Sequence, residues 1–185
     1  MNEMNETIRN ILERRSVRSY TSLLPPEDEV MQIVECGRFA ATALGRQPWF
    51  FSVVYDRGLL DDISAECAEA MRNAGIVPPG GEAPDCFRGA PMAIIISADD
   101  SAPFAEADSA NATQNMAVAA KSLGIGSCYI ASFRRAFEGG KGLEFKNRLC
   151  VPLGFSPRFA LALGYAASPL PPRKEREEDR VEIIR

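Results

Sequence analysis

The chain has 185 residues and a net charge of −4, with an isoelectric point near 5.1. Hydrophobic residues make up 46% of it and charged residues 25%, a balance typical of one soluble globular domain spanning residues 1–185. The acidic excess argues against nucleic acid or an anionic membrane surface as the main partner.

The chain contains no histidine, which excludes catalytic triads and general bases built on histidine and removes the commonest metal ligand. Its five cysteines are scattered without a CxxC pair, so we expect reduced thiols in the cytoplasm rather than a disulfide framework or a zinc site. The polar start and the short apolar runs predict neither a secretory signal nor a membrane span. If the protein is an enzyme, a cofactor is expected to supply its chemistry.

The first part of the chain changes from helical to strand patterns. Residues 6–15 carry apolar side chains at i, i+3 and i+4, which predicts a helix. Pro26 and the three acids after it predict the start of a second helix, because proline fits the first turn and acids complement the positive end of the helix dipole. The core-facing stripe of this helix is expected at Val30, Val34 and Ala41. Residues 49–55 (WFFSVVY) favour a strand because they are aromatic and β-branched.

The middle of the chain predicts a helix over residues 59–72, followed by a Pro/Gly-rich surface excursion over 75–89. Residues 91–98 predict a buried strand, because they form a short apolar run. A long helix over residues 107–123 is expected to end at Gly124, which is placed as a C′ glycine.

The last part of the chain contains a short strand or turn at 126–130, a helical and loop region at 134–149 and a strand at 158–166. A charged tail follows. This alternation predicts a mixed sheet with helices, and the pattern alone is compatible with both an α+β and an α/β domain.

Two basic segments are candidate phosphate sites. Arg14, Arg15, Ser16 and Arg18 place three guanidiniums and a hydroxyl within five residues, a set suited to a phosphate or a polarised carbonyl edge. Arginines also commonly close a helix, where they complement the C-terminal dipole. The second segment, at Arg173, Lys174 and Arg176, equally fits a solvated charged tail.

Two loops are candidates for presenting backbone groups to a ligand. In the loop before residue 49, Pro48 is expected to hold Gln47 in an extended conformation. A plain helix-to-strand connection with Trp49 in the core explains that loop equally well. At residues 124–130, two glycines permit close approach of the backbone to a ligand, and a helix C-cap with a turn is the alternative.

Four segments, in this order, resemble the nitroreductase family along nearly the whole chain. ERRSVRSY resembles its Arg-Arg-Ser-x-Arg-x-aromatic signature, and ATALGRQPWFFSVV its Pro-Ser-x-x-Asn-x-Gln-Pro-Trp-x-Phe strand entry. ADSANATQNMAVAAKSLGIGSCYIASF is similar to the family's long helix and Leu-Gly-hydrophobic-Gly turn. VPLGFSPRFALALGYAASPLPPRK is similar to its closing Pro-x-Gly…Gly-Tyr strand and basic tail.

The resemblance implies an α+β, nitroreductase-like fold with a central, mostly antiparallel sheet flanked by helices. It also implies an intertwined homodimer with non-covalently bound FMN at the subunit interface. No side chain is expected to be catalytic, since FMN carries the chemistry. In this reading NADH or NADPH reduces FMN, and a small oxidised acceptor such as a nitroaromatic compound or a quinone then takes the electrons in a ping-pong cycle.

The resemblance further implies which residues bind FMN. Arg14, Arg15, Ser16 and Arg18 would hold its phosphate and its N1/O2 edge, while Tyr129, Ile130, Ala131 and Ser132 would lie near N5 and O4. Thr42, Ala43, Gly45 and Gln47 would reach the flavin of the partner subunit. Arg173, Lys174 and Arg176 are candidates for a further phosphate contact. Gly45 departs from the family pattern, which has asparagine there, so that side chain is absent from this loop while the loop's backbone remains for the site.

Two other functions remain compatible with the same sequence. The protein could reduce a different substrate, such as an enoate or a halogenated aromatic compound, or fragment flavin. It could also be a flavin-binding carrier or sensor with little turnover. Oxidation of nicotinamide in the presence of an acceptor separates an enzyme from a carrier, and a colourless purified protein would indicate a flavin-free structural module.

Overall fold

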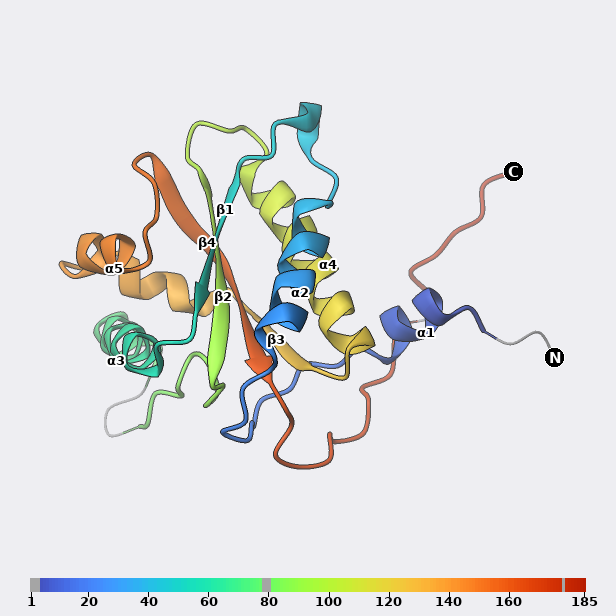
Figure 1. Ribbon diagram of the computed structural model, residues 1–185, viewed down its shortest axis with the longest axis horizontal. Coiled ribbons are helices and arrows are strands. Elements are labelled where there is room, and N and C mark those ends of the chain that lie inside the picture. The colour runs from blue at the N-terminus through green and yellow to red at the C-terminus, as the bar shows by residue number, and fades with distance from the viewer. Residues whose placement is uncertain (1–3, 78–80, 178) are drawn as a thin grey trace.

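The computed structural model describes residues 4–77, 81–177 and 179–185. Its centre is one antiparallel sheet with the strand order β1-β2-β4-β3 (Figure 1). The strands are β1 (Trp49–Val54), β2 (Met92–Asp99), β3 (Gly126–Ile130) and β4 (Phe155–Gly164). Phe51 lies opposite Ile96 and Ile95 opposite Ala160, with an irregularity in register after Ile96.

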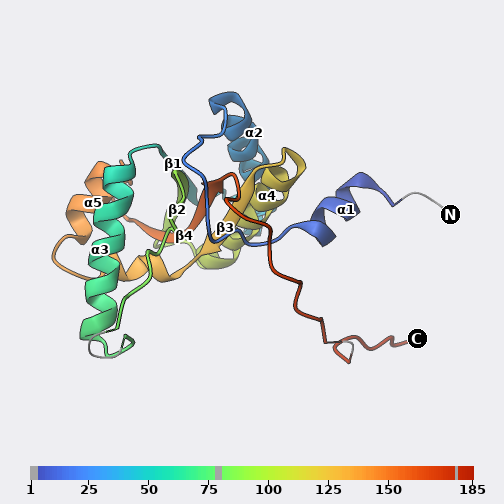
Figure 2. The same cartoon turned by 90° about the horizontal axis from the view of Figure 1, so that it is seen from below.

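Helices cover both faces of this sheet, as the view from below shows (Figure 2). On one face lie α2 (Glu27–Arg38) and α4 (Ala105–Ser122). On the other lie α3 (Arg57–Asn73), the 3-10 helix η2 (Ser132–Phe137) and α5 (Gly142–Arg148). No helix in the described parts of the chain combines the length and the apolarity needed to cross a membrane.

The core consists of two apolar clusters, one on each face of the sheet. Because side chains alternate along a strand, Ile94 and Ile96 of β2 face α2 and α4, while Ile95 faces α3 and η2. Met116 of α4 and Phe133 of η2 are fully buried at the centres of the two clusters. The predicted strand over 91–98 and the predicted α+β architecture are thereby confirmed.

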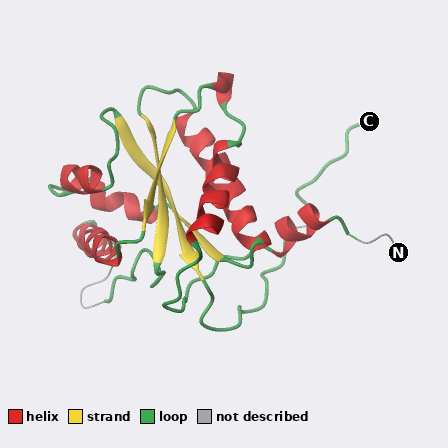
Figure 3. Cartoon of the chain, viewed as in Figure 1, coloured by secondary structure: helices red, strands yellow, loops and turns green. Residues whose placement is uncertain are grey.

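The two ends of the chain lie away from this sandwich. Helix α1 (Glu6–Glu13) begins at Asn5, whose side-chain oxygen accepts a hydrogen bond from Thr7 N at 3.0 Å, and it buries none of its residues. The described residues after β4, 165–177 and 179–185, form an irregular tail without helix or strand (Figure 3). An amphipathic helix that covers no core of its own chain leaves its apolar side exposed.

Several predicted boundaries are confirmed to within two or three residues. Gly124 ends α4 as expected, with φ +74 and a hydrogen bond from its N–H to Lys121 O. The N–H of Ile125 donates to Ala120 O, which completes the glycine-ended turn. The region 134–149 divides into η2 and α5, and the loop before β1 contains a 3-10 turn, η1 (Ala43–Gly45).

Three expectations were wrong. Ala41 is exposed because it lies beyond the end of α2, and Ile33 joins Val30 and Val34 in the buried stripe. Gln47 is not extended but left-handed, with φ +49, so the preference that a following proline imposes for an extended backbone is overridden in this loop. Within 75–89, where 78–80 lie outside the described residues, Cys86 and Phe87 belong to the core instead of the surface.

Candidate functional site

The segment that follows α1 lies beside the edge strand β3. Ser16 forms a parallel bridge with Ser127, and Val17 N donates to Ser127 O at 2.8 Å. A Cβ atom at Gly126 would lie 2.8 Å from Val17 Cγ2, so glycine permits this close approach. The contact orients residues 14–18 along β3.

Four arginines gather at one end of this segment and form what we call the basic cluster: Arg14, Arg15, Arg173 and Arg176. Arg15 Nη2 donates to Pro171 O at 2.7 Å, and Arg173 Nη2 donates to Arg14 O at 3.4 Å. Burial lowers the pKa of Arg14, and the charges of Arg173, Arg176 and Arg15 lower it further. The tail therefore brings like charges together against a half-buried guanidinium.

No carboxylate neutralises the basic cluster within the described residues. Other cations pair with acids: Lys121, beside the cluster, binds Glu13 at 3.2 Å. The cluster borders a hollow of about 190 Å³ that Arg14, Arg15 and Gly126 help to line; Glu13 and Lys121, which pair with each other, line it as well. Forked guanidinium donors that lack an acidic partner are suited to an oxyanion such as phosphate.

Residues 16–18, which follow Arg14 and Arg15, extend away from the basic cluster along β3. Arg14 and Arg18 are four residues apart, a separation of about 13 Å in an extended backbone. Arg18 is exposed. Lys174 is also exposed and makes no hydrogen bond or ion pair with any residue that the structure describes, so the structure does not join it to the cluster.

The predicted turn at residues 129–132 lies at the opposite end of β3. The ring of Tyr129 packs edge-on against Phe159 at 4.9 Å, and burial raises the pKa of Tyr129 to about 12. Ile130 is buried in the core, whereas Ala131 and Ser132 are exposed. The accessible part of this turn is thus its backbone and the Ser132 side chain.

The loop at residues 42–47 is held by the first turn of α4. Asp108, which is only 4% exposed, accepts a hydrogen bond from Ala43 N at 2.9 Å. Thr42 Oγ1 accepts one from Gln47 N at 3.4 Å. Gly45 is left-handed, with φ +65 and no atom within 4 Å of an added Cβ.

This loop and the basic cluster lie at opposite ends of α4. Asp108 holds the loop in the first turn, while Lys121 lines the hollow at the last turn. Thirteen residues of α-helix separate them by about 20 Å. A single chain therefore does not bring the predicted loop to the predicted phosphate position.

Comparison with known proteins gives the family of this chain. The sequence model described as the Nitroreductase family matches residues 11–165. The chain belongs to the nitroreductase family. The predicted nitroreductase-like fold is confirmed, while Arg173 and Arg176 lie beyond the matched region.

Relatives of this nitroreductase-family chain are found among both sequences and structures. A protein of Archaeoglobus fulgidus, provisionally named an NADH dehydrogenase/NAD(P)H nitroreductase, is 30% identical over 88% of this chain and 86% of its own. A Bacillus subtilis protein named FMN reductase (NADPH) is 26% identical over 89% of this chain and 68% of its own. The crystal structure of a Bacteroides fragilis nitroreductase with bound FMN is 28% identical, covers 98% of this chain and 100% of its own, and has a TM-score of 0.89.

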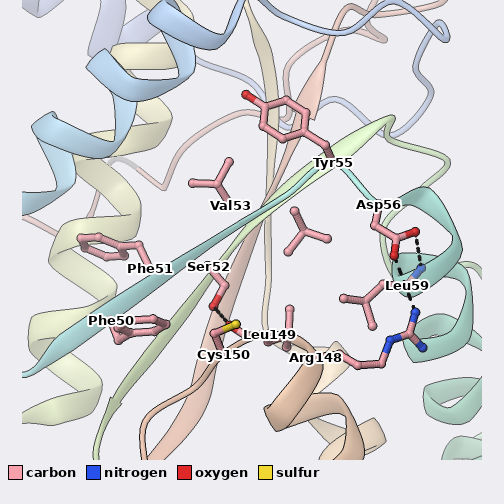
Figure 4. A pocket seen from close by; sticks show the side chains of 11 residues that line it. Phe50, Phe51, Ser52, Val53, Tyr55, Asp56, Leu59, Arg148, Leu149 and Cys150 are labelled. Atoms are coloured by element: carbon pink, nitrogen blue, oxygen red, sulfur yellow. Dashed lines mark hydrogen bonds and ion pairs between the residues drawn. The ribbon is translucent and has the colours of Figure 1, made fainter.

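The nitroreductase-family chain has a second large hollow, along the free edge of β1 (Figure 4). It has a volume of about 460 Å³ and contains none of the predicted site residues. Ser52 Oγ, which lines this hollow, donates a hydrogen bond to Leu149 O at 2.6 Å. The cationic side chain that lines the hollow, Arg148, pairs with Asp56 and Asp62. Because acids neutralise this cation, the hollow is a poor phosphate site.

Sequence reasoning missed two residues at the site of this nitroreductase-family chain. Asp108 holds the 42–47 loop, and Arg88 lies close enough to β3 for its charge to act on Cys128. The only signal for Asp108 was its place in the first turn of a predicted helix. Arg88 carried no signal, because it lies in the Pro/Gly-rich stretch that favoured a surface loop.

Proposed function

We propose that the protein is an FMN-dependent oxidoreductase that uses NADH or NADPH to reduce a small oxidised acceptor, such as a nitroaromatic compound or a quinone, in a ping-pong cycle. The observation that carries this proposal is the basic cluster, which has no carboxylate partner within the described residues. FMN has one phosphate for such a cluster, and the chain lacks the glycine fingerprint expected of a dinucleotide fold. The names of the Bacillus and Bacteroides relatives support the same cofactor.

In this proposal each end of the 14–18 segment has its own role. Arg14, with the other arginines of the basic cluster, binds the phosphate, and the Ser16 hydroxyl donates a further hydrogen bond. Arg18, about 13 Å away, holds the flavin edge that gains negative charge on reduction. Bound FMN supplies the hydride- and electron-transfer chemistry.

The turn at Ala131 and Ser132 would provide backbone N–H groups to the reactive edge of the flavin. The thiol of Cys67 donates to Ser132 O at 3.3 Å, which fixes the orientation of this turn from inside the core. We assign no side-chain acid or base to the reaction, so the protein's part is to bind, orient and electrostatically tune the cofactor.

We extend the proposal to a homodimer with FMN at the subunit interface. The 42–47 loop lies about 20 Å from the basic cluster of its own chain, so it would contact the flavin of a partner. Phe39 is 80% exposed and Leu44 81%, and α1 buries none of its residues. A groove of about 620 Å³ between α1, α2 and α4 continues this apolar surface, which a second copy would cover. All five cysteines are free thiols, which suits the cytoplasm, where we place the protein.

The test begins with the purified protein. We expect acid precipitation followed by chromatography to release FMN, and NADH or NADPH to be oxidised when a quinone or nitroaromatic compound is added. Recovery of FAD alone, or of no flavin, would contradict the proposal. Bound FMN without nicotinamide oxidation would identify a carrier.

A matched pair of variants tests the basic cluster itself. Arg14→Gln should weaken FMN binding by about 10- to 100-fold, because a hydrogen bond to a charged group contributes about 1.5–3 kcal/mol. Arg72→Gln removes the same charge from the exposed end of α3, on the other face of the sheet, and should leave binding unchanged. Equal affinities of the two variants for FMN, measured by fluorescence titration of the apoproteins, would show that Arg14 does not bind the phosphate.

A further inference from the structure

Two cysteines that are far apart in the sequence lie together in the apolar cluster between the sheet and α3. Cys67 belongs to α3, and Cys86 belongs to a turn at residues 85–90. Both are buried, with exposures of 0% and 3%, and both are free thiols. Their spacing in the sequence forms no CxxC motif, so only the fold brings them together.

Hydrogen bonds hold the two cysteines against each other. The Ser64 hydroxyl, one turn before Cys67 on α3, accepts a hydrogen bond from Cys86 N at 2.9 Å. This bond fixes the backbone of Cys86 beside the helix, and the two thiols hydrogen-bond to each other. Because their sulfur atoms are already in contact, a small movement of the turn brings them to the disulfide bonding distance of about 2.05 Å.

The two thiols differ in chemical character. The hydrogen bond from Cys86 and the positive charge of Arg135 lower the pKa of Cys67, although burial and the charge of Glu138 oppose them. The same contact with Cys67, together with burial, raises the pKa of Cys86. Since the thiolate is the form that attacks an oxidant, Cys67 is suited to be the nucleophile and Cys86 the thiol that resolves it.

Cys67 also holds the turn at residues 129–132. As a thiol it donates a hydrogen bond to Ser132 O at 3.3 Å, which links α3 to the first residue of η2. A sulfur atom in a disulfide has no hydrogen to donate. Oxidation of Cys67 therefore removes this bond, so the state of the thiol pair is coupled to the start of η2.

The segment that covers the pair is irregular. Residues 81–90 contain no helix or strand, and the side chain of Asp85, next to Cys86, is 31% exposed. Local opening of such a segment costs less free energy than opening of a packed helix or a sheet. A small oxidant thus reaches the two thiols without unfolding of α3 or β2.

We infer that Cys67 and Cys86 are a redox-active pair that a hydroperoxide oxidises to a reversible disulfide, which withdraws the thiol donor from Ser132 O. The Cys67 thiolate attacks the peroxide, the O–O bond breaks, and Cys67 becomes a sulfenic acid while the other oxygen takes a proton and leaves as alcohol or water. The Cys86 sulfur then attacks the Cys67 sulfur, the S–O bond breaks, and water leaves with the Cys86 proton. The two sulfurs together lose two electrons to the peroxide. No step requires FMN, so failure of the proposed function would leave this pair unaffected.

The test treats the purified, reduced protein with an equimolar amount of hydrogen peroxide. The remaining thiols are blocked after unfolding, and the peptides are mapped by mass spectrometry. We expect a peptide pair joined through Cys67 and Cys86, the loss of two of the five thiols, and recovery of both with dithiothreitol. Because the disulfide closes a loop of the chain, the Tm should rise by about 5–10 °C. Amide hydrogen exchange at the start of η2 should become at least twofold faster, because Ser132 O has lost its thiol donor.

Three serine variants assign the roles of the two thiols. Cys86→Ser keeps a hydroxyl donor beside Cys67 but forms no disulfide, so peroxide should leave a Cys67 sulfenic acid that dimedone traps. Cys67→Ser should leave Cys86 unmodified, because its protonated thiol does not attack peroxide. Cys36→Ser changes an exposed cysteine of α2 and should form the same disulfide as the wild type.

The outcomes that would overturn the inference are distinct. Five intact thiols after peroxide treatment, or a disulfide through Cys128 in place of Cys67 or Cys86, contradict the pairing. Oxidation of Cys86 in Cys67→Ser contradicts the assigned nucleophile, and unchanged hydrogen exchange at the start of η2 contradicts the link to Ser132. The wild-type peptide map decides the pairing even if neither buried serine variant folds.

Discussion

Replacing Asp85 with asparagine should destabilise the protein, because the Asp85 side chain accepts hydrogen bonds from the backbone of the turn at residues 85–90. Gly89 N and Arg57 Nη2 donate to one oxygen of Asp85, at 2.7 and 3.0 Å, and Phe87 N and Ser64 Oγ donate to the other, at 2.8 and 2.9 Å. The amide keeps the size of the carboxylate but directs its NH2 group at one of these two pairs of donors. Each hydrogen bond to a charged group contributes about 1.5–3 kcal/mol. The Asp85 side chain is 31% exposed, so water recovers part of the loss of two such bonds. We expect the free energy of unfolding to fall by about 2–4 kcal/mol.

The pH dependence gives this prediction a second signature. Burial by itself raises the pKa of Asp85, but the N–H groups of Gly89 and Phe87 and the Arg57 guanidinium outweigh it and hold that pKa below its ordinary value. The stabilisation is therefore complete above the unfolded-state pKa of about 3.9 and is lost as the pH falls through the lower folded-state value. The gap between wild type and Asp85→Asn should be constant from about pH 5 to 7 and shrink below about pH 4.

Urea denaturation of the apoproteins at several pH values measures both effects. Asp61→Asn is the matched control, because Asp61 pairs with the same Arg57 but is 57% exposed, and it should cost less than about 1 kcal/mol. A loss for Asp85→Asn no larger than this control, or a gap that widens on acidification, would refute the reasoning.

Four further substitutions test other parts of the structure. Gly126→Ala places a Cβ 2.8 Å from Val17 Cγ2, so we expect about 1–3 kcal/mol less stability in thermal melts and weaker FMN binding. Gly45→Asn restores the family residue at a left-handed position that asparagine tolerates. It should tighten FMN binding by about 0.5–1.5 kcal/mol, whereas weaker binding in a fluorescence titration would show that this loop has diverged. Arg18→Gln should make the flavin midpoint potential more negative and slow its reduction by nicotinamide, and an unchanged midpoint contradicts the role of Arg18. Phe39→Asp, at an 80% exposed position, should dissociate the homodimer in light scattering with little change in monomer stability; a dimer that persists places the interface elsewhere.

Local patterns in the sequence were sufficient for most of the secondary structure. The apolar run of β2 and the glycine after α4 are signals carried by a few adjacent residues, and both were read correctly. Four family motifs in order also identified the fold, because the family pattern already contains the packing of these elements. The order β1-β2-β4-β3 followed from no local pattern, since strand pairing depends on contacts between residues far apart in the chain.

The candidate site shows most clearly what only the tertiary structure decided. The sequence identified Arg14 and Arg173 as basic residues, but it did not show that the tail returns across 159 positions so that Arg173 donates to Arg14 O. Gln47 proved left-handed although a proline follows it. Charge, size and conformational preference belong to each residue and can be read along the chain. Which charges remain without a partner depends on the neighbours that folding supplies, and the proposal that the basic cluster binds an anion rests on this property.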